Sequence, residues 1–334
     1  MPDQARAMTT AIGIRGITAE PGRKSQGFVT IGETVSGPIQ FPVVIVNGAQ
    51  DGPTLCLTSG VHATEYAPID AVMRIVQSTE PAKLCGAVIA VPVVNMRMFE
   101  SRTGFVSPLD GINLNKVAPG RADGSISEIL AQVLLDEVIC RAAYHIDLHA
   151  GDLGEMLLPF AGYALTGNRE LDEQGETLAR LYSPKLISLA DSSGKIPPFA
   201  DGICHAATRR GVVSIFAESG GNGTLEEADV RVHVDGVMNV MRHLRMIDGA
   251  PTTNGPRLSA RDRKVVRATR AGLLRVRVRI GDELAAGQEV AEVCNVFGEV
   301  VETIRSSGAG IAGLVWAHKV VNTGDPVVRY WIVN

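Results

Sequence analysis

The stretch TSGVHATEYAPIDAV, residues 58–72, joins a short apolar run at Leu55–Leu57 to a helical pattern at Tyr66–Val76. A buried strand that leads into a helix is the repeating unit of α/β sheets. His62 and Glu65 lie at the junction, three positions apart. Neither side chain suits a hydrophobic core. The stretch therefore predicts a strand–helix unit and raises the question of whether the two residues hold a metal.

Strand and helix patterns alternate through the residues around this junction. Apolar runs typical of strands lie at 28–31, 41–46, 54–57, 87–94, 144–149 and 211–218. Helical spacing is found at 66–78, 125–140, 169–182 and 225–245. Residues 95–123 are rich in Gly, Pro and Asn and predict a long loop, which in a compact domain is usually functional or disordered. The alternation predicts a doubly wound α/β sheet.

The composition changes at DGAPTTNGPRLS, residues 248–259, where Pro, Gly, Thr and Asn indicate a linker. Short strand patterns and glycine turns follow, without a helical pattern of any length. We therefore expect a catalytic α/β domain at 1–250 and a smaller, all-β domain at 251–334, which we expect to pack at the mouth of the first.

The composition excludes several classes of protein. The 334 residues are 45% apolar and 20% charged, as in soluble globular proteins, and the net charge of −4 argues against a general nucleic-acid binder. The five cysteines form no CxxC pair, which argues against a disulfide framework or a cysteine-ligated zinc. The amino terminus lacks the apolar core of a signal peptide, and no apolar run approaches the ~20 residues that span a bilayer. These features predict a reduced, cytoplasmic protein without a membrane partner.

Three motifs in the carboxy-terminal segment have an ordinary structural interpretation. GAGIAG, residues 308–313, matches GxGxxG, but strand patterns follow it where a dinucleotide site needs a helix, so we expect a β-turn. Arg275, Arg277 and Arg279 alternate with Val without aromatic residues between them, which favours a solvated strand face over a nucleic-acid patch. GDELAAGQEVAEV, residues 281–293, resembles the lipoyl and biotinyl carrier fold, but the turn SGAGIAG lacks the carrier lysine.

A hydrolytic zinc site needs three protein ligands and one open position. His62 and Glu65 can converge on one point from a helix start, although HxxE alone often occurs by chance. YHIDLHAGD, residues 144–152, supplies a third candidate in His149, at the carboxyl end of a strand where α/β sheets build their sites. Asp147 could fix the tautomer of a ligand histidine or hold nearby loops. His145 lies deeper in the strand, and we interpret it as structural.

Such a site also needs a general base. Glu218 ends the apolar strand VVSIFA and opens the glycine-rich loop ESGGNG, residues 218–223. Apolar strand residues would place its carboxylate at the lip of that loop, which favours a chemical role. The alternative is a glutamate that caps a helix or fixes the loop.

The order of these motifs resembles one family. HxxE, then NLNK at 113–116, DLH at 147–149 and a strand that ends in ES at 218–219 are similar to the succinylglutamate desuccinylase/aspartoacylase family, relatives of the zinc carboxypeptidases. The resemblance extends from about residue 25 to the end, and it includes the all-β tail. It implies a mixed sheet of zinc-carboxypeptidase type, one zinc ion bound by His62, Glu65 and His149, and Glu218 as general base and acid.

The resemblance also implies roles for residues near 101–116. The family places an arginine there that steadies the oxyanion, and Arg102 is the best match, with Arg97 as the second candidate. An Asn-Arg pair of the family grips the substrate carboxylate, whereas this chain has Asn115-Lys116, with Asn113 in the same motif. Lysine lacks the planar fork of arginine, so a dicarboxylic acyl group such as succinyl is less favoured. DLHAGDLGE, residues 147–155, resembles the branch that deacetylates N-acetyl-diaminobutyrate.

The sequence thus predicts a zinc-dependent amidohydrolase that removes an acyl group from a small N-acyl amino acid. A carboxypeptidase-like peptidase is the neighbouring alternative. A zinc-binding or ligand-binding protein without turnover, on the same scaffold, is the alternative from another class. The expected partner is the small-molecule substrate, and homo-oligomer formation is left open.

Overall fold

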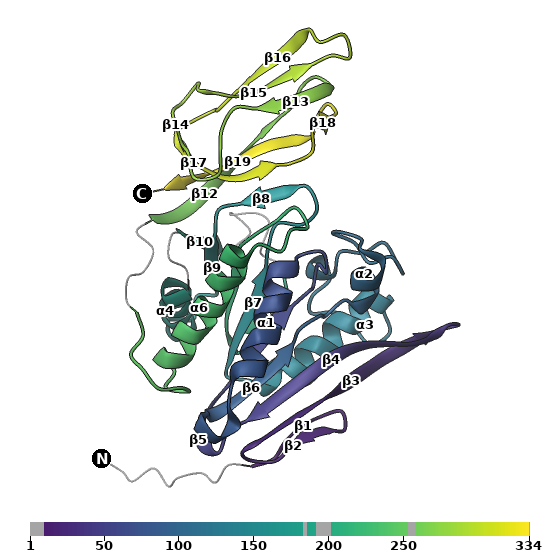
Figure 1. Cartoon of the computed structure of the whole chain (residues 1–334), viewed down its shortest axis with the longest axis vertical. Helices are drawn as coiled ribbons and strands as arrows, with labels where there is room; N and C mark the ends of the chain where they lie inside the picture. The colour runs from purple at the N-terminus through teal and green to yellow at the C-terminus, as the bar shows by residue number, and fades with distance from the viewer. Residues whose placement is uncertain (1–9, 183–185, 192–201, 253–257, 334) are drawn as a thin grey trace.

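The computed structural model describes residues 10–182, 186–191, 202–252 and 258–333 (Figure 1). Within them one sheet of 13 strands has the order β14-β17-β19-β12-β10-β9-β11-β7-β5-β6-β4-β3, with β8 beside β17. Its first strands are β3 (Arg23–Thr34), β4 (Gly37–Asn47), β5 (Gln50–Ser59), β6 (Cys85–Val91), β7 (Tyr144–His149), β8 (Glu155–Leu157), β9 (Phe160–Leu165), β10 (Leu186–Asp191) and β11 (Val213–Glu218).

The centre of the sheet is parallel. β6, β5, β7 and β11 are neighbours in that order and run in one direction, whereas β9 pairs antiparallel with β11 and β4 pairs antiparallel with β6. β6, β7 and β11 are almost entirely buried, because helices cover both faces of the sheet. β6 is apolar throughout, whereas β7 also buries His145, Asp147 and His149. The carboxyl ends of β5, β7 and β11 meet at one edge, which brings residues after position 59 close to His149 and Glu218.

Helices cover both faces of this sheet. α1 (Tyr66–Ser78), α4 (Arg169–Tyr182) and α6 (Glu227–His243) bury their apolar faces with Leu55 and Leu57 of β5, on the side where Figure 1 shows the three helices together. α3 (Ile126–Val133), α5 (Ile203–Arg209) and the hairpin of β1 (Ile12–Ile14) and β2 (Ile17–Ala19) pack on the other face with Cys56. Alternate residues of one strand thus enter two different cores, which confirms the doubly wound mixed sheet.

Most predicted elements are present at or near the expected residues. The helices at 66–78 and 169–182 have the expected bounds, and 225–245 is shortened to α6. The pattern at 125–140 gives α3, followed by a π-helical turn at Leu134–Val138 and a 3₁₀ turn at Ile139–Arg141. The loop at 95–123 contains α2 (Met96–Ser101) and a 3₁₀ turn at Leu114–Lys116. Strands β8, β9 and β10 and helix α5 were not predicted.

The carboxy-terminal segment consists of strands, and it continues the large sheet. β12 (Leu258–Arg267) pairs parallel with β10, and β17 (Gly310–Trp316) pairs antiparallel with β8. β14 (Glu283–Leu284) and β19 (Pro326–Val333) complete this end of the sheet. β13 (Gly272–Val276), β15 (Glu289–Cys294), β16 (Val300–Arg305) and β18 (Val320–Val321) form a second sheet over a core of their own. The division at 250/251 stays a prediction, and backbone pairing crosses it.

The three motifs of this segment have simple structural roles. The GAGIAG run does not form the predicted turn throughout, because it begins in a bend and its last four residues open β17. The register shifts between Ala312 and Leu314, so the glycines serve a bulged strand. Arg275, Arg277 and Arg279 are exposed, and Arg277 forms an ion pair with Glu292.

All five cysteines are unpaired. A search of the described residues finds no helix long and apolar enough to cross a membrane.

Gly162 of β9 tests how tightly the sheet is packed beside the carboxyl edge. It lies opposite Phe216 of β11, and a Cβ at this position would lie 2.2 Å from Cζ of the Phe216 ring. Gly162→Ala should therefore destabilise the protein by about 1–3 kcal/mol in urea unfolding, as overpacked cores do. Gly32→Ala is the control, because its Cβ would meet only a side-chain methyl at 3.4 Å, and its effect should stay within about 1 kcal/mol.

The clash with Phe216 also predicts that substitutions at positions 162 and 216 are energetically coupled. Phe216→Leu should cost less in the Gly162→Ala background than in the original protein, because the smaller side chain relieves the overlap. A double-mutant cycle with a coupling energy below about 0.5 kcal/mol would show that the ring does not restrict this position.

Candidate metal centre

A tight turn between β5 and α1 brings His62 beside Glu65. The amide of Glu65 donates to the carbonyl oxygen of His62 at 3.3 Å, and Glu65 is the residue immediately before the first residue of α1. The strand ends at Ser59, and Gly60 follows with φ of +67°, a conformation that favours glycine. Glu65 is buried, so the junction presents a carboxylate inside the protein rather than on its surface.

The side chains of His62, Glu65 and His149 converge. Nδ1 of His62 lies 2.9 Å from one carboxylate oxygen of Glu65, and Nδ1 of His149 lies 3.0 Å from the other. The candidate ligand atoms of the three residues all lie within 4.8 Å of one another. His62 and Glu65 come from the turn between β5 and α1, and His149 comes from the end of β7. The edge of the sheet therefore brings the three residues together.

The opposite nitrogen of each imidazole has a partner of its own. Nε2 of His149 lies 3.1 Å from Asp147, whose second oxygen accepts a hydrogen bond of 2.6 Å from the Thr58 hydroxyl. Nε2 of His62 lies 3.2 Å from Oδ1 of Asn113. That oxygen also accepts from the amide of Asn115 at 2.9 Å, which fixes it as the acceptor. Both imidazoles are thus held with Nε2–H directed outward and Nδ1 directed at Glu65.

The charges of the cluster fit a bound cation. Burial opposes charge on both Glu65 and His149, but the two imidazoles lower the pKa of Glu65 to about 2. Asp147 and Glu65 in turn raise the pKa of His149 well above its usual range. A positive charge between these carboxylates and the Nδ1 atoms is therefore strongly favoured. A metal ion could take the place of the proton, and an outward partner on Nε2 is the usual support of a ligand histidine.

His145 has the structural role that its depth predicted. Its Nε2 lies 2.8 Å from the Thr58 hydroxyl, and its Nδ1 lies 2.8 Å from the Ser214 hydroxyl. Burial, with little compensation from Asp147, lowers its pKa to about 4, so the ring is neutral at pH 7. It ties β5, β7 and β11 together beneath the cluster. Asp147 accordingly contacts the ligand-type histidine rather than a loop.

Glu218 lies beside the cluster on the next strand. It is the register partner of His149 across β11 and β7. Both residues line a small cavity of about 30 Å³, enough for a water molecule, together with Asn115 and Phe216. Oε2 of Glu218 is buried without a hydrogen-bond partner among the described residues. Burial raises the pKa of this carboxyl well above its usual range, with Glu65 and Glu155 adding to the effect.

A hydrogen-bond network that the sequence did not reveal supports the Glu218 loop. The amide of Ser219 donates to the carbonyl of His149 at 3.1 Å, and the Ser219 hydroxyl donates to Asp229 at 2.9 Å. The buried His233 of α6 donates from Nε2 to the carbonyl of Ser219 at 3.2 Å, while its Nδ1 lies 2.7 Å from the Tyr182 hydroxyl. His233 lies within the amphipathic helix α6. The sequence pattern therefore did not distinguish it as a residue that supports the site.

The residues predicted near 97–116 lie in different surroundings. The Arg97 guanidinium donates to Glu100 at 3.0 Å and to the carbonyl of Pro38 at 3.1 Å, which occupies it away from the cluster. Arg102 is exposed and ends α2 in the left-handed conformation, with φ of 56°. Asn115 accepts from the amide of Ile203 at 3.1 Å, and its Nδ2 lies 3.4 Å from Nε2 of His149. Lys116 is exposed.

Asp152 is a second residue that sequence reasoning missed. It is buried, and it accepts hydrogen bonds from the Thr64 hydroxyl and from the amides of Phe105 and Leu153. The carboxylate thereby joins the strand–helix junction to the loop that carries the predicted arginine and asparagines. It stands in the quoted run YHIDLHAGD, where its residue type was the only available signal.

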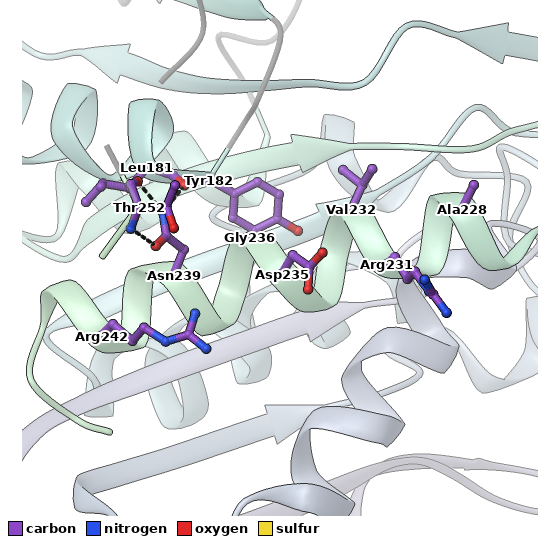
Figure 2. A pocket seen from close by; sticks show the side chains of 10 residues that line it. All are labelled: Leu181, Tyr182, Ala228, Arg231, Val232, Asp235, Gly236, Asn239, Arg242 and Thr252. Atoms are coloured by element: carbon purple, nitrogen blue, oxygen red, sulfur yellow. Dashed lines mark hydrogen bonds between the residues drawn. The ribbon is translucent and has the colours of Figure 1, made fainter. Parts of the chain in front are cut away.

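A larger cavity lies away from the cluster. It has a volume of about 450 Å³ between α4 and α6, and Figure 2 shows Tyr182, Asp235 and Asn239 among the side chains that line it. Asn239 donates to the carbonyls of Leu181 and Thr252 at 2.7 and 2.9 Å. None of the predicted site residues lines this cavity. We therefore keep the cluster as the candidate reaction site.

Comparisons with known proteins agree with the geometry. The profile of the succinylglutamate desuccinylase/aspartoacylase catalytic domain matches residues 51–244, a span that includes the cluster and Glu218. The N-alpha-acetyl-L-2,4-diaminobutyric acid deacetylase of Halomonas elongata is 27% identical over 305 residues, which cover 88% of this chain and 86% of that protein.

Solved structures show the same fold over nearly the whole chain. A succinylglutamate desuccinylase from Silicibacter is 22% identical, covers 100% of both chains and has a TM-score of 0.85. The product-bound ectoine utilization protein EutE from Ruegeria pomeroyi is 22% identical, covers 92% of this chain and 94% of its own, and has a TM-score of 0.83. At these identities the structures establish the fold.

The buried His233 predicts a pH dependence of stability. Burial lowers its pKa to about 4 in the folded protein, from an ordinary value of 6.5. The unfolded chain therefore binds more protons between these values, and stability is lost as the pH falls from 6.5 toward 4. His233 should contribute about 2 kcal/mol of this loss between about pH 7 and about pH 5.

The measurement is urea unfolding at both pH values, in the presence of a chelator so that metal binding adds no pH dependence of its own. His233→Gln should flatten the dependence, and the exposed His243→Gln should not. An unchanged slope in His233→Gln would contradict a neutral, buried His233.

Proposed function

Because this chain belongs to the succinylglutamate desuccinylase/aspartoacylase family, a family of deacylases, we propose that it is a zinc-dependent amidohydrolase that removes the acyl group from a small N-acyl amino acid. One observation carries the proposal. Two imidazole Nδ1 atoms and a carboxylate converge within 4.8 Å, and a buried carboxyl without a partner lies on the neighbouring strand at the register position of His149.

The donor set suits zinc. His62, Glu65 and His149 would hold the ion, and two imidazoles with one carboxylate are a common ligand set of zinc hydrolases, which leave a further position open. When bound at such a site, zinc supplies a water nucleophile at neutral pH and polarises the carbonyl of the amide. Asp147 and Asn113 hold the two imidazoles so that each Nδ1 points at Glu65, where both nitrogens could serve as ligands.

Glu218 would move the proton. Its Oε2 has no other hydrogen-bond partner to give up, and its raised pKa brings the carboxyl closer to the range in which one group can both take and return a proton. We assign it the removal of a proton from the attacking water and the delivery of that proton to the departing amine. The hydrogen bonds of Ser219 to His149 and Asp229 hold its loop in place.

Arg102 is the candidate for the oxyanion. Arg97 is held by Glu100 and Pro38, whereas Arg102 forms no such pair with a residue that the structure describes, and it borders the loop that Asp152 anchors. A cation brought against the developing negative charge would stabilise the tetrahedral state. Asn115 and Lys116 stay candidates for orienting the substrate carboxylate, with Asn113 beside them.

An acetyl group is the acyl group that we favour. The Halomonas elongata relative is named for deacetylation of N-alpha-acetyl-L-2,4-diaminobutyric acid. Lys116 stands where the family has arginine, which weakens bidentate recognition of a second carboxylate. Release of free amine from N-acetyl, N-formyl and N-succinyl amino acids tests this choice. Cleavage of peptides but not of these compounds would favour the peptidase, and zinc binding without any turnover would favour a binding protein.

Removal of one ligand tests the metal assignment. His62→Ala and His149→Ala should each purify with far less than one zinc per chain by elemental analysis, because each loses one of only three protein ligands. His243→Ala should keep the zinc content of the unmodified protein, because His243 is exposed. Stoichiometric zinc in both ligand variants would refute the assignment.

Glu218→Gln tests the proton transfer. Glutamine has the same size and reach but cannot accept a proton, so turnover should fall at least about 100-fold, the lower end for general acid–base steps. Zinc content and melting temperature should stay close to those of the unmodified protein. Near-normal turnover in a folded, zinc-loaded variant would end the role of Glu218. A joint loss of turnover and stability would favour a loop-fixing glutamate instead.

A further inference from the structure

One face of the sheet formed by β8, β17 and β19 carries Glu155, Trp316 and Arg329. β17 pairs Leu314 with Arg329 of β19 and Trp316 with Glu155 of β8. Paired residues of neighbouring strands share a face, and so do residues two apart, so Glu155, Trp316 and Arg329 lie on one side of the sheet. The next residues along the same strands, such as Val328, face the separate core of the carboxy-terminal segment.

This face reaches the strand of Glu218. Trp331 lies two residues after Arg329, and its ring centroid is 5.2 Å from that of Phe160. The ring centroids of Phe160 and Phe216 are 6.0 Å apart. Phe216 lines the small cavity together with Glu218. A continuous row of aromatic rings therefore connects the Arg329 side of β19 with the wall of the site.

Arg329 is a half-buried cation on this face, and its charge is incompletely matched. Its guanidinium lies over the Trp316 ring, 5.4 Å from the centroid, and its Nε is buried without a hydrogen-bond partner among the described residues. No described carboxylate forms an ion pair with it, although the charges of Glu155 and Glu218 both act on it. A half-buried guanidinium whose buried nitrogen has no hydrogen-bond partner can therefore gain from an anion that a ligand supplies.

The chemistry of the missing partner follows from the residue type. The planar fork of arginine matches a carboxylate with two parallel hydrogen bonds, and a low-dielectric surrounding strengthens them. Arg263 of β12 pairs in register with Trp331, so a second guanidinium stands on the same face. The Arg263 guanidinium lies over the Trp331 ring, 5.7 Å from its centroid.

We propose that Arg329 binds a carboxylate of the substrate, so that the carboxy-terminal segment contributes a specificity-determining residue to the site. The proposal rests on the proposed function for the identity of the substrate. The carboxylate belongs either to the amino acid or to the acyl group. In both cases Arg329 supplies the planar fork that Lys116 lacks, from a part of the sequence far from the predicted motif.

The test uses the zinc-loaded, full-length protein and the variants Arg329→Gln and Arg329→Lys. Three substrates separate the sources of the carboxylate: an N-acetyl amino acid, its carboxamide, and an N-succinyl amine. If the amino-acid carboxylate is bound, kcat/KM of Arg329→Gln should fall about 10- to 100-fold for the first substrate, mainly through KM, as for loss of a hydrogen bond to a charged group. The other two should change less than about 3-fold. A selective fall for the N-succinyl amine would place the acyl carboxylate there.

Binding provides a readout that does not depend on turnover. Calorimetry with the free amino acid and with its carboxamide should show a preference for the carboxylate that Arg329→Gln abolishes and Arg329→Lys retains in part. Arg275→Gln, an exposed arginine of β13, is the matched control and should behave as the unmodified protein. If Arg329→Gln fails to fold, Arg329→Lys carries the same comparisons.

The outcomes distinguish the two proposals. An equal loss for all three substrates, or no loss for any, overturns the role of Arg329, because a structural residue or a distant charge would not discriminate by carboxylate. If no substrate is cleaved by the unmodified protein, the proposed function fails, while the preference in calorimetry still decides whether Arg329 recognises a carboxylate.

Discussion

The carboxylate of Glu65 is the constraint on which the site depends. One oxygen faces His62, and the other faces His149 and accepts from the amide of Ala150 at 2.9 Å. A single buried anion thus fixes the end of β7 against the start of α1 and sets the direction of both imidazoles. Because a buried carboxylate needs compensation at every lone pair, the backbone on both sides has little freedom to move apart. The parallel strands bring these groups to one edge, and Glu65 determines how they face.

The fold could be predicted from sequence where the apolar pattern is strong. β11 and the second half of β5 are buried and mostly apolar, β7 has the alternation of a short strand, and α1 and α4 keep a clear helical spacing. β9 and β10 were missed because FAGYAL and LISLAD are short and mix small and polar residues that turns also use. The helix at 125–140 carried the right period, but the periodicity of side chains cannot distinguish an α-helical turn from the π-helical turn at Leu134–Val138.

The candidate ligands could be predicted because their residue types are conspicuous at strand ends. His62, Glu65, His149 and Glu218 lie at the edge where an α/β sheet places its chemistry, and the matched family profile spans all four, while their roles stay predictions. Supporting residues could not be found in this way. His233, Asp152 and Arg329 come from a helix, a loop and a distant strand, and only the folded chain shows that each of them faces the same region. Their roles depend on tertiary neighbours, which no local pattern records.

The parallel pairing of β10 with β12 affects when an exposed sheet edge is covered during folding. β10 would be the last strand of the sheet if the chain stopped before β12, and its outer backbone amides and carbonyls would be open to any other strand. β12 covers that edge, and β19 then covers β12. During synthesis the edge of β10 is therefore open until β12 has emerged, and the edge of β12 is then open until β19 has emerged. The carboxy-terminal segment thereby removes a sheet edge that could otherwise pair with another chain.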